Sequence, residues 1–142
     1  MTENWDKLLE MCKGNEAAAR FCHVFVSHCH CIDDIVDGDK EADAERIIHN
    51  MVALLLEMNQ NPFYVKNSNY LLPLILHGYN SWLDSNDWEM SKKDHEVIAA
   101  DVLKGYYHEV VFGVIYLCGG WEHLRNVTSE HRSYDFELEK GE

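Results

Sequence analysis

Apolar residues recur every three or four positions along most of the chain, which is the period of α-helices that bury one face. No segment alternates apolar and polar residues over the length of a strand with turn signals at both ends. The pattern therefore predicts an all-α protein, a single compact bundle of about five to six helices.

Glycine, proline and asparagine residues divide this pattern into segments. Gly14 and Gly38 are expected to end helices, because glycine readily adopts the left-handed conformation that terminates a helix. Asp39 is placed to cap the next helix, and Pro62 follows the break after that helix. The predicted helices span residues 2–13, 15–37, 39–58, 69–83 and 91–118.

Local signals define the ends of the last two predicted helices. Pro73 fits a helix only in the first turn, where its missing N–H has no partner to lose. Residues 85–87, which read Ser-Asn-Asp, are expected to form the turn that follows. Ser91 and Asp94 have the spacing of a capping box, and the glycine pair 119–120 is expected to end the helix that they begin.

Beyond the glycine pair, residues 121–125 are expected to add one helical turn. Residues 129–142 are polar and acidic, which is typical of a loosely docked tail. The chain is therefore predicted to form one helical domain over residues 1–128, followed by an acidic C-terminal tail.

The charge balance narrows the classes of partner. The 142 residues include 25 acidic and 12 basic side chains, for a formal net charge of −13. Nucleic acids and anionic membrane surfaces attract basic clusters, and the sequence has none, so neither is expected as a partner.

The cysteine content and the hydropathy of the chain predict where in the cell the protein is found. The five cysteines are odd in number and include no Cys-x-x-Cys pair, so they are expected to be reduced thiols. The sequence shows no cleavable leader and no apolar run of about 18 residues that could span a bilayer. These features predict a cytoplasmic protein without a membrane span.

An Asp-Asp-x-x-Asp motif at the end of the second predicted helix is the first candidate for chemistry. At about 100° per residue, Asp34 and Asp37 share a polar face with His23 and His30, and Asp33 lies at the border of that face. Carboxylates one turn apart can direct their oxygens to one point, which suits a hard cation such as Mg²⁺.

The position of these aspartates on the helix gives a second reason to expect a cation. A helix C-terminus carries partial negative charge, so each carboxylate there costs about 0.3–1 kcal/mol, and a bound cation would offset that cost. The alternative is that the aspartates are solvated or cap the next helix, in which case no ion is needed.

A second candidate lies in the predicted helix 91–118, where Asp101, Gly105 and Glu109 follow one another at steps of four and His108 flanks them. These steps place the two carboxylates on neighbouring parts of one face, with a gap between them. A glycine inside a helix costs up to about 1 kcal/mol, so it indicates the close approach of a ligand or of another helix.

Together the two motifs resemble those of class I isoprenoid (terpenoid) synthases. The segment from His30 to Asp39 is similar to the first aspartate-rich motif of prenyl diphosphate synthases, and the second candidate is similar to the second metal-binding motif of terpene cyclases. Val102 departs from the family pattern, because aspartate is usual at that position.

The resemblance implies an all-helical cavity in which Mg²⁺ ions bind an allylic diphosphate and assist its departure. By resemblance, Asp33 and Asp37 would bridge two Mg²⁺ ions with support from Asp34, while Asp101 and Glu109 would hold a third. It assigns no catalytic residue and no diphosphate-binding side chain in this chain.

Three histidines, His23, His30 and His108, are candidates for additional polar lining of such a site. His23 and His30 share a face with Asp34 and Asp37, so they could instead join them as metal ligands in a hydrolase-like site. The alternative role for these histidines is hydrogen bonding within the bundle.

Two functional hypotheses follow. The first is Mg²⁺-dependent binding or turnover of a small molecule that bears a diphosphate, as in a prenyl transferase or a terpene-synthase-like lyase. The second is a non-enzymatic helical protein whose apolar faces serve homo-oligomerisation or another protein partner, with a degenerate site.

Overall fold

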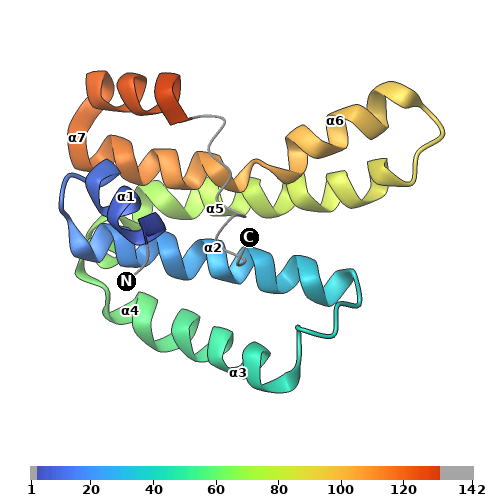
Figure 1. Cartoon of the computed structure of the whole chain (residues 1–142), viewed down its shortest axis with the longest axis horizontal. Coiled ribbons are helices and arrows are strands. Elements are labelled where there is room, and N and C mark those ends of the chain that lie inside the picture. The colour runs from blue at the N-terminus through green and yellow to red at the C-terminus, as the bar shows by residue number, and fades with distance from the viewer. Residues whose placement is uncertain (1–2, 132–142) are drawn as a thin grey trace.

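The computed structural model describes residues 3–131, and these residues are helical with no strand (Figure 1). The prediction of an all-α bundle is therefore confirmed. The elements, in chain order, are α1 (Glu3–Met11), α2 (Glu16–Val36), α3 (Ala44–Val52), the π-helical turn η1 (Ala53–Glu57), α4 (Met58–Gln60), α5 (Pro62–Glu89), α6 (Asp94–Lys104) and α7 (Tyr107–His131).

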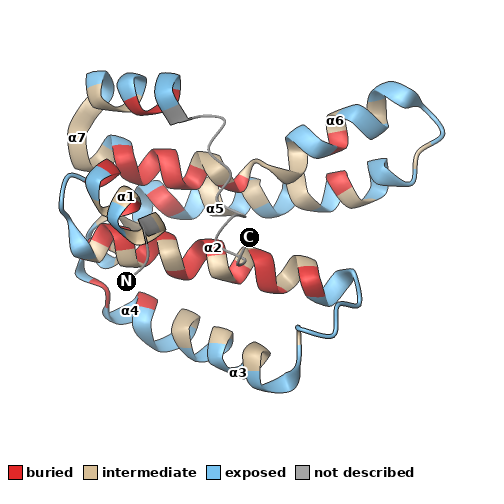
Figure 2. Ribbon diagram, viewed as in Figure 1, coloured by how far each residue is buried: buried red, intermediate tan, exposed pale blue. Residues whose placement is uncertain are grey.

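Helix α2 runs through the middle of the bundle and contacts α3, α5 and α7 (Figure 1). Its N-terminus is capped by Asn15, whose side chain accepts a hydrogen bond from the Ala18 N–H at 3.0 Å. Gly38 follows its C-terminus with φ of 71°, as the glycine signal predicted. Buried residues concentrate on α2 and on the first half of α7 (Figure 2).

The hydrophobic core joins the apolar face of α2 to α1, α5 and α7. Phe21 stacks on Phe25 with ring centroids 6.1 Å apart and on Tyr64 at 5.3 Å. The largest fully buried apolar side chains of the core are Phe21, Leu71, Ile115, Val110, Val111 and Val114. Long-range contacts among distant helices therefore hold the bundle together.

The third predicted helix begins later than expected. Asp43, not Asp39, caps α3, and its side chain accepts a hydrogen bond from the Arg46 N–H at 2.9 Å. Asp39 instead accepts a hydrogen bond from the Glu41 N–H at 2.8 Å, within the loop between α2 and α3. Both aspartates can satisfy nearby backbone donors, and the sequence alone did not show which of them begins the helix.

Helix α5 is longer than predicted at both ends. Asn61 caps it by accepting a hydrogen bond from the Tyr64 N–H at 3.0 Å, and Pro62 occupies the first turn, where proline is tolerated. The helix continues through Pro73 and through Ser85, which the sequence placed in a turn. Ser85 is fully buried and donates a hydrogen bond to the Trp82 carbonyl at 2.6 Å, so its hydroxyl is satisfied without ending the helix.

The predicted helix 91–118 is wrong, because the chain breaks at Gly105 into α6 and α7. Ser91 accepts a hydrogen bond from the Lys93 N–H at 3.0 Å, but the helix starts only at Asp94, with Lys93 as a cap that makes no side-chain bond. The capping-box prediction is therefore also wrong. Together, α6 and the end of α5 form a hairpin that extends beyond the rest of the bundle (Figure 1).

Helix α7 reverses direction at the predicted glycine pair. Gly120 has φ of 85°, and the helix resumes after it and runs to His131, well beyond the single turn expected. His123 on this second half hydrogen bonds the Met11 carbonyl at 2.7 Å, which ties it to the end of α1. Residues 129–131 of the predicted tail belong to α7, and residues 132–142 lie outside the described part.

The close contact between α5 and α7 depends on a small residue. A Cβ atom at Gly113 would lie 2.7 Å from Leu74 Cδ1, so a larger residue would force the leucine side chain to move. Nearby, Tyr70 of α5 stacks on Tyr116 of α7 with ring centroids 6.0 Å apart. In residues 3–131, no helix is both long enough and apolar enough to cross a membrane.

We expect Asn61→Ala to lower the free energy of unfolding by about 2 kcal/mol, because it removes the cap of α5 and a second hydrogen bond that joins α5 to α2. The Asn61 side chain donates to the Ala17 carbonyl at 2.8 Å and is 8% exposed. Chemical denaturation measures the loss, with the exposed Asn59→Ala as control. An equal loss of unfolding free energy in both variants would contradict the assignment of Asn61 as the cap of α5.

Candidate functional site

The polar face of α2 lies against α3 and η1, and the two sides enclose a groove of about 340 Å³. We call it the α2–α3 groove. From α2 it is lined by Arg20, His23, Val24, Ser27, His30 and Cys31, and from α3 and η1 by Arg46, His49, Asn50, Ala53 and Glu57. The sequence identified His23 and His30 as candidate polar lining, and the structure places both in this groove.

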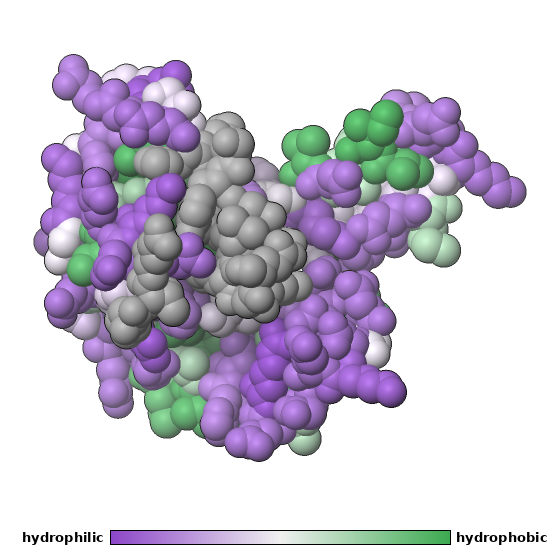
Figure 3. Space-filling view, in the orientation of Figure 1, coloured by the Kyte–Doolittle hydropathy of each residue, from purple (hydrophilic) through white to green (hydrophobic). Residues whose placement is uncertain are grey.

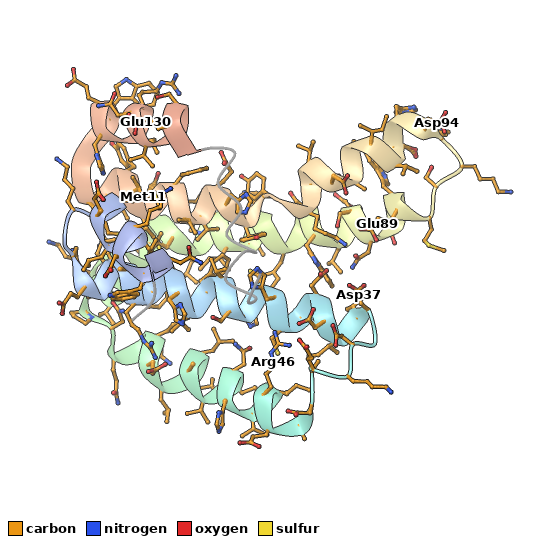
Figure 4. All side chains as sticks on the ribbon, viewed as in Figure 1. Met11, Asp37, Arg46, Glu89, Asp94 and Glu130 are labelled. Carbon is orange, nitrogen blue, oxygen red and sulfur yellow. The ribbon has the colours of Figure 1, made fainter. Side chains whose placement is uncertain are left out.

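Asp34 of the first acidic motif is buried and pairs with Arg46 at one end of the groove. Arg46 Nη1 donates to Asp34 Oδ2 at 2.7 Å, and the Asp34 side chain is 9% exposed. This hydrogen bond is the main reason why the pKa of Arg46 is raised above its ordinary value. The cation next to Asp34 is therefore a side chain of α3 (Figure 4).

Asp33 lies on the other side of α2 and faces α6. Its Oδ1 is 3.6 Å from Lys104 Nζ, and the same ammonium forms a closer ion pair with Glu89. Burial alone would lower the pKa of Lys104, but the hydrogen bond to Glu89 and the charge of Asp33 outweigh it, so the net change is upward. Lys104 thus joins α2, α5 and α6 through two carboxylates.

The remaining predicted metal ligands lie on different elements. Asp37 is exposed at the C-terminus of α2, at the end of the bundle where Glu89 also lies (Figure 4). Asp101 is exposed on α6 and Glu109 is half-buried on α7, and Gly105 separates them. The steps of four had predicted that Asp101 and Glu109 share one face of a continuous helix. That prediction is wrong, because they lie on two helices.

Within residues 3–131, no group of three or more His, Cys, Asp or Glu side chains is arranged to hold a metal ion. The aspartates of the first motif are divided between two sides of α2, one toward Arg46 and one toward Lys104. Magnesium binding and diphosphate chemistry stay predictions from the sequence. The arrangement of these carboxylates supplies no argument for a site in which magnesium ions hold a diphosphate.

The candidate histidines have different surroundings. Burial, followed by the charge of Arg20, lowers the pKa of His23 below its ordinary value. His30 is buried with its ring edge-on to Tyr107 at a centroid distance of 6.1 Å, and His108 packs on the same tyrosine at 4.3 Å. His23 lines the groove from a half-buried position, whereas His30 lines it while buried and contacts Tyr107 of α7, on which His108 also packs.

Sequence reasoning missed His28, which joins three helices. Its Nδ1–H donates to Asn50 Oδ1 of α3 at 3.0 Å, and its Nε2 accepts a hydrogen bond from the Tyr79 hydroxyl of α5. Only the neutral imidazole can donate at one nitrogen and accept at the other. Burial accordingly lowers the pKa of His28 below its ordinary value.

The spacing of residues on either side of the loop between α2 and α3 could have predicted some of these contacts. The pairs Arg20–Glu57, His28–Asn50 and Asp34–Arg46 are all centred near Asp39, as expected for two antiparallel helices folded about one loop. With that loop assumed, residues at equal distances from it face each other. No comparable signal relates Tyr79 or Lys104 to α2.

The outer face of the α3–η1 segment carries the second candidate feature. Five apolar side chains there are 46% to 62% exposed and follow one another at helical steps of three, one, three and one: Ile48, Met51, Val52, Leu55 and Leu56. We call this set the α3 stripe. The segment thus turns a polar face toward α2 and an apolar face away from it, the reverse of a usual surface helix.

Hydrophobic surface is visible over the segment that joins α3 to α4 and again over α6 (Figure 3). On α6 the exposed apolar residues are Val97, Ile98 and Val102. On α5, Leu72, Leu76, Tyr79 and Leu83 are exposed at helical steps of four, three and four. The α3 stripe is denser, because its five exposed apolar side chains lie within residues 48–56.

No family model, curated protein or solved structure matches this chain. The fold is that of an all-α helical bundle, and its two features that suit binding are the α2–α3 groove and the exposed apolar faces.

We expect acidification to destabilise the protein through His28. Because the folded-state pKa of His28 is lowered, its neutral form stabilises the fold above the ordinary value of 6.5, and this stabilisation is lost as the pH falls through the lower folded-state value. Urea denaturation at several pH values measures the loss. His28→Gln should be less stable at neutral pH and should lose less on acidification than the wild type.

The exposed His77 provides the control for this measurement. His77→Gln should keep the acid dependence of the wild type, because this imidazole makes no contact of the kind that holds His28. The same acid dependence in His28→Gln as in the wild type would assign the effect to other groups.

Proposed function

We propose that this protein is a non-enzymatic helical interaction protein that self-associates through the α3 stripe. The observation that carries the proposal is the stripe itself: five neighbouring apolar side chains, each about half exposed, on the face of α3 and η1 that points away from the bundle. Exposed apolar patches of this kind are typical of protein–protein contacts.

The energetics favour covering this face. Burying the exposed half of a Leu, Ile, Val or Met side chain contributes about 1 kcal/mol, and a two-fold contact would bury ten such side chains at once. That sum is comparable with the free energy that association costs through lost translational and rotational freedom. Additional contacts around the stripe would then decide the affinity.

A second copy of the chain suits the stripe because an apolar helix face is complementary to itself. The stripe contains no charged residue, while Asp43 and Glu45 lie at the N-terminal end of α3 and Glu57, which is paired with Arg20, lies at the other end of the segment. An antiparallel pairing places the acidic end of one copy beside the end of the other where the carboxylate is already paired. A parallel pairing would bring the acidic ends of both copies together, which costs free energy.

We expect Leu55→Glu to raise the dissociation constant of the self-associated form at least about 100-fold, because each contact would then bury a carboxylate among apolar side chains. Leu55 is 62% exposed, so the monomer should keep its fold. Sedimentation equilibrium measures the constant, and circular dichroism checks the helix content.

Ile98→Glu is the matched control for this substitution. Ile98 is an apolar residue on α6 that is 70% exposed, and it lies outside the stripe. This variant should associate as the wild type does. A wild-type chain that stays monomeric at about 100 μM, or equal effects of both substitutions, would rule out the α3 stripe as the contact.

We also expect salt to strengthen the self-association. Two copies that each carry a formal net charge of −13 repel one another, and raising the ionic strength from about 0.1 M to about 1 M shortens the Debye length from about 10 Å to about 3 Å. An apolar contact is not weakened by this screening. Sedimentation in a sodium chloride series should show the dissociation constant falling, whereas a contact built on ion pairs would show it rising.

A further inference from the structure

We propose that the α2–α3 groove binds a small molecule that carries a phosphate group. This inference is separate from self-association, because the groove lies on the α2 side of α3 and the α3 stripe lies on the opposite side. Three properties of the groove support it: its charge, its hydrogen-bond donors and its size.

The groove lacks the negative charge that the chain carries elsewhere. The sequence has 25 acidic and 12 basic residues, whereas at the groove Arg20 is balanced by Glu57 and Arg46 by Asp34. An anion that enters the groove therefore meets two guanidinium groups without the net repulsion that the rest of the protein exerts.

Arg46 is held in place to serve as a donor. The buried carboxylate of Asp34 lies outside the groove lining and accepts a hydrogen bond from Arg46 Nη1 at 2.7 Å. A guanidinium has five N–H donors in a rigid fork, and this bond uses one of them. A buried carboxylate that orients an arginine in this way lowers the entropy that the arginine loses when it binds a ligand.

Arg20 is available to a ligand at small cost. Its Nη2 pairs with Glu57 Oε1 at 2.6 Å, but both side chains are more than 40% exposed. Ion pairs this exposed contribute about 0–1 kcal/mol, so an incoming phosphate can replace Glu57 without a large loss of stability. A phosphate group with two negative charges also bonds a guanidinium more strongly than an exposed carboxylate with one charge does.

Other polar side chains complete both walls. His23 and Ser27 of α2 face His49 and Asn50 of α3 across the groove, and Ala53 leaves room between them. Each of these polar side chains can donate an N–H or O–H. A tetrahedral phosphate can accept bonds from both walls at once, whereas a planar carboxylate presents its oxygens in one plane.

The size of the groove indicates more than a free phosphate ion. Its volume of about 340 Å³ lies at the lower end of the range for small-molecule sites, about 300–1,000 Å³. The ligand class is therefore a phosphate ester or a diphosphate compound of small size. The two arginines stand at opposite ends of the groove, since one pairs with Glu57 of η1 and the other with Asp34 near the end of α2.

The test uses inorganic diphosphate as the probe, with EDTA present so that divalent ions play no part. Isothermal titration calorimetry of the full chain should show binding that Arg20→Gln weakens at least about tenfold. Arg125→Gln is the matched control, because this exposed arginine lies on α7, outside the groove, and donates a hydrogen bond to Thr128 Oγ1 at 3.3 Å. The control should bind diphosphate as the wild type does.

Histidine resonances locate the bound probe independently of any arginine substitution. Diphosphate should shift the imidazole signals of His23 and His49 in a carbon–proton correlation spectrum and leave those of His77 and His95 in place. The latter two are exposed and lie on α5 and on α6. Arg46→Lys, which keeps the charge but loses the fork, should weaken diphosphate binding less than Arg20→Gln does, because Arg46 lies at the opposite end of the groove, about 20 Å along α2.

Three results would overturn the inference: no binding of diphosphate in EDTA, equal affinities of Arg20→Gln and the wild type, or loss of binding in Lys104→Gln instead. The last result would place the anion at the Asp33–Lys104–Glu89 cluster. Repeating the titration on the Leu55→Glu monomer separates the two proposals, because the groove should bind diphosphate whether or not the chain self-associates.

Discussion

The burial of α2 is the constraint on which the rest of the structure depends. More than half of its residues are buried, and they include His28, His30 and Asp34 as well as the apolar core residues. A helix that is buried on several sides needs an apolar partner for its apolar face and a hydrogen-bonding partner for each polar group that leaves water. Helices α5 and α7 supply the apolar partner, while Arg46 and Asn50 of α3, together with Tyr79 of α5, supply hydrogen bonds.

The need for hydrogen-bonding partners on α2 explains why α3 has a polar inner face and an apolar outer face. Because its inner face carries Arg46 and Asn50 to satisfy Asp34 and His28, the apolar residues of the same segment cannot all turn inward. Five of them remain on the outer face. The groove and the α3 stripe are thus two consequences of one arrangement, and both proposed activities of the protein arise from the polar requirements of α2.

The acidic motif has a structural role in this arrangement. Asp34 and Asp33 each lie beside a protein cation, Arg46 and Lys104, and these ion pairs connect α2 to α3 and to α6. Removing Arg46 would leave the buried carboxylate of Asp34 without its partner, which costs more than the pair itself contributes. The same carboxylates that resemble metal ligands in the sequence therefore serve as helix contacts in the fold.

The sequence by itself determined the helical class, the helix ends at Gly14, Gly38 and the glycine pair, and the polar face of α2. These features depend on local periodicity and on the conformational freedom of glycine, both of which can be read from neighbouring residues. The bounds of α5 and the break at Gly105 could not be predicted in this way. Ser85 stays helical by bonding a carbonyl of its own helix while buried, and Gly105 ends a helix that its neighbours alone would continue.

Only the tertiary structure decided which charges meet. The pairing of Asp33 with Lys104 and of His28 with Tyr79 joins residues 71 and 51 positions apart, and no local pattern encodes such distances. The steps of four from Asp101 to Glu109 predicted a shared face only as long as one helix contained both. Gly105 divides that helix into α6 and α7. The direction of each carboxylate then depends on how the two helices pack, which residue spacing does not encode.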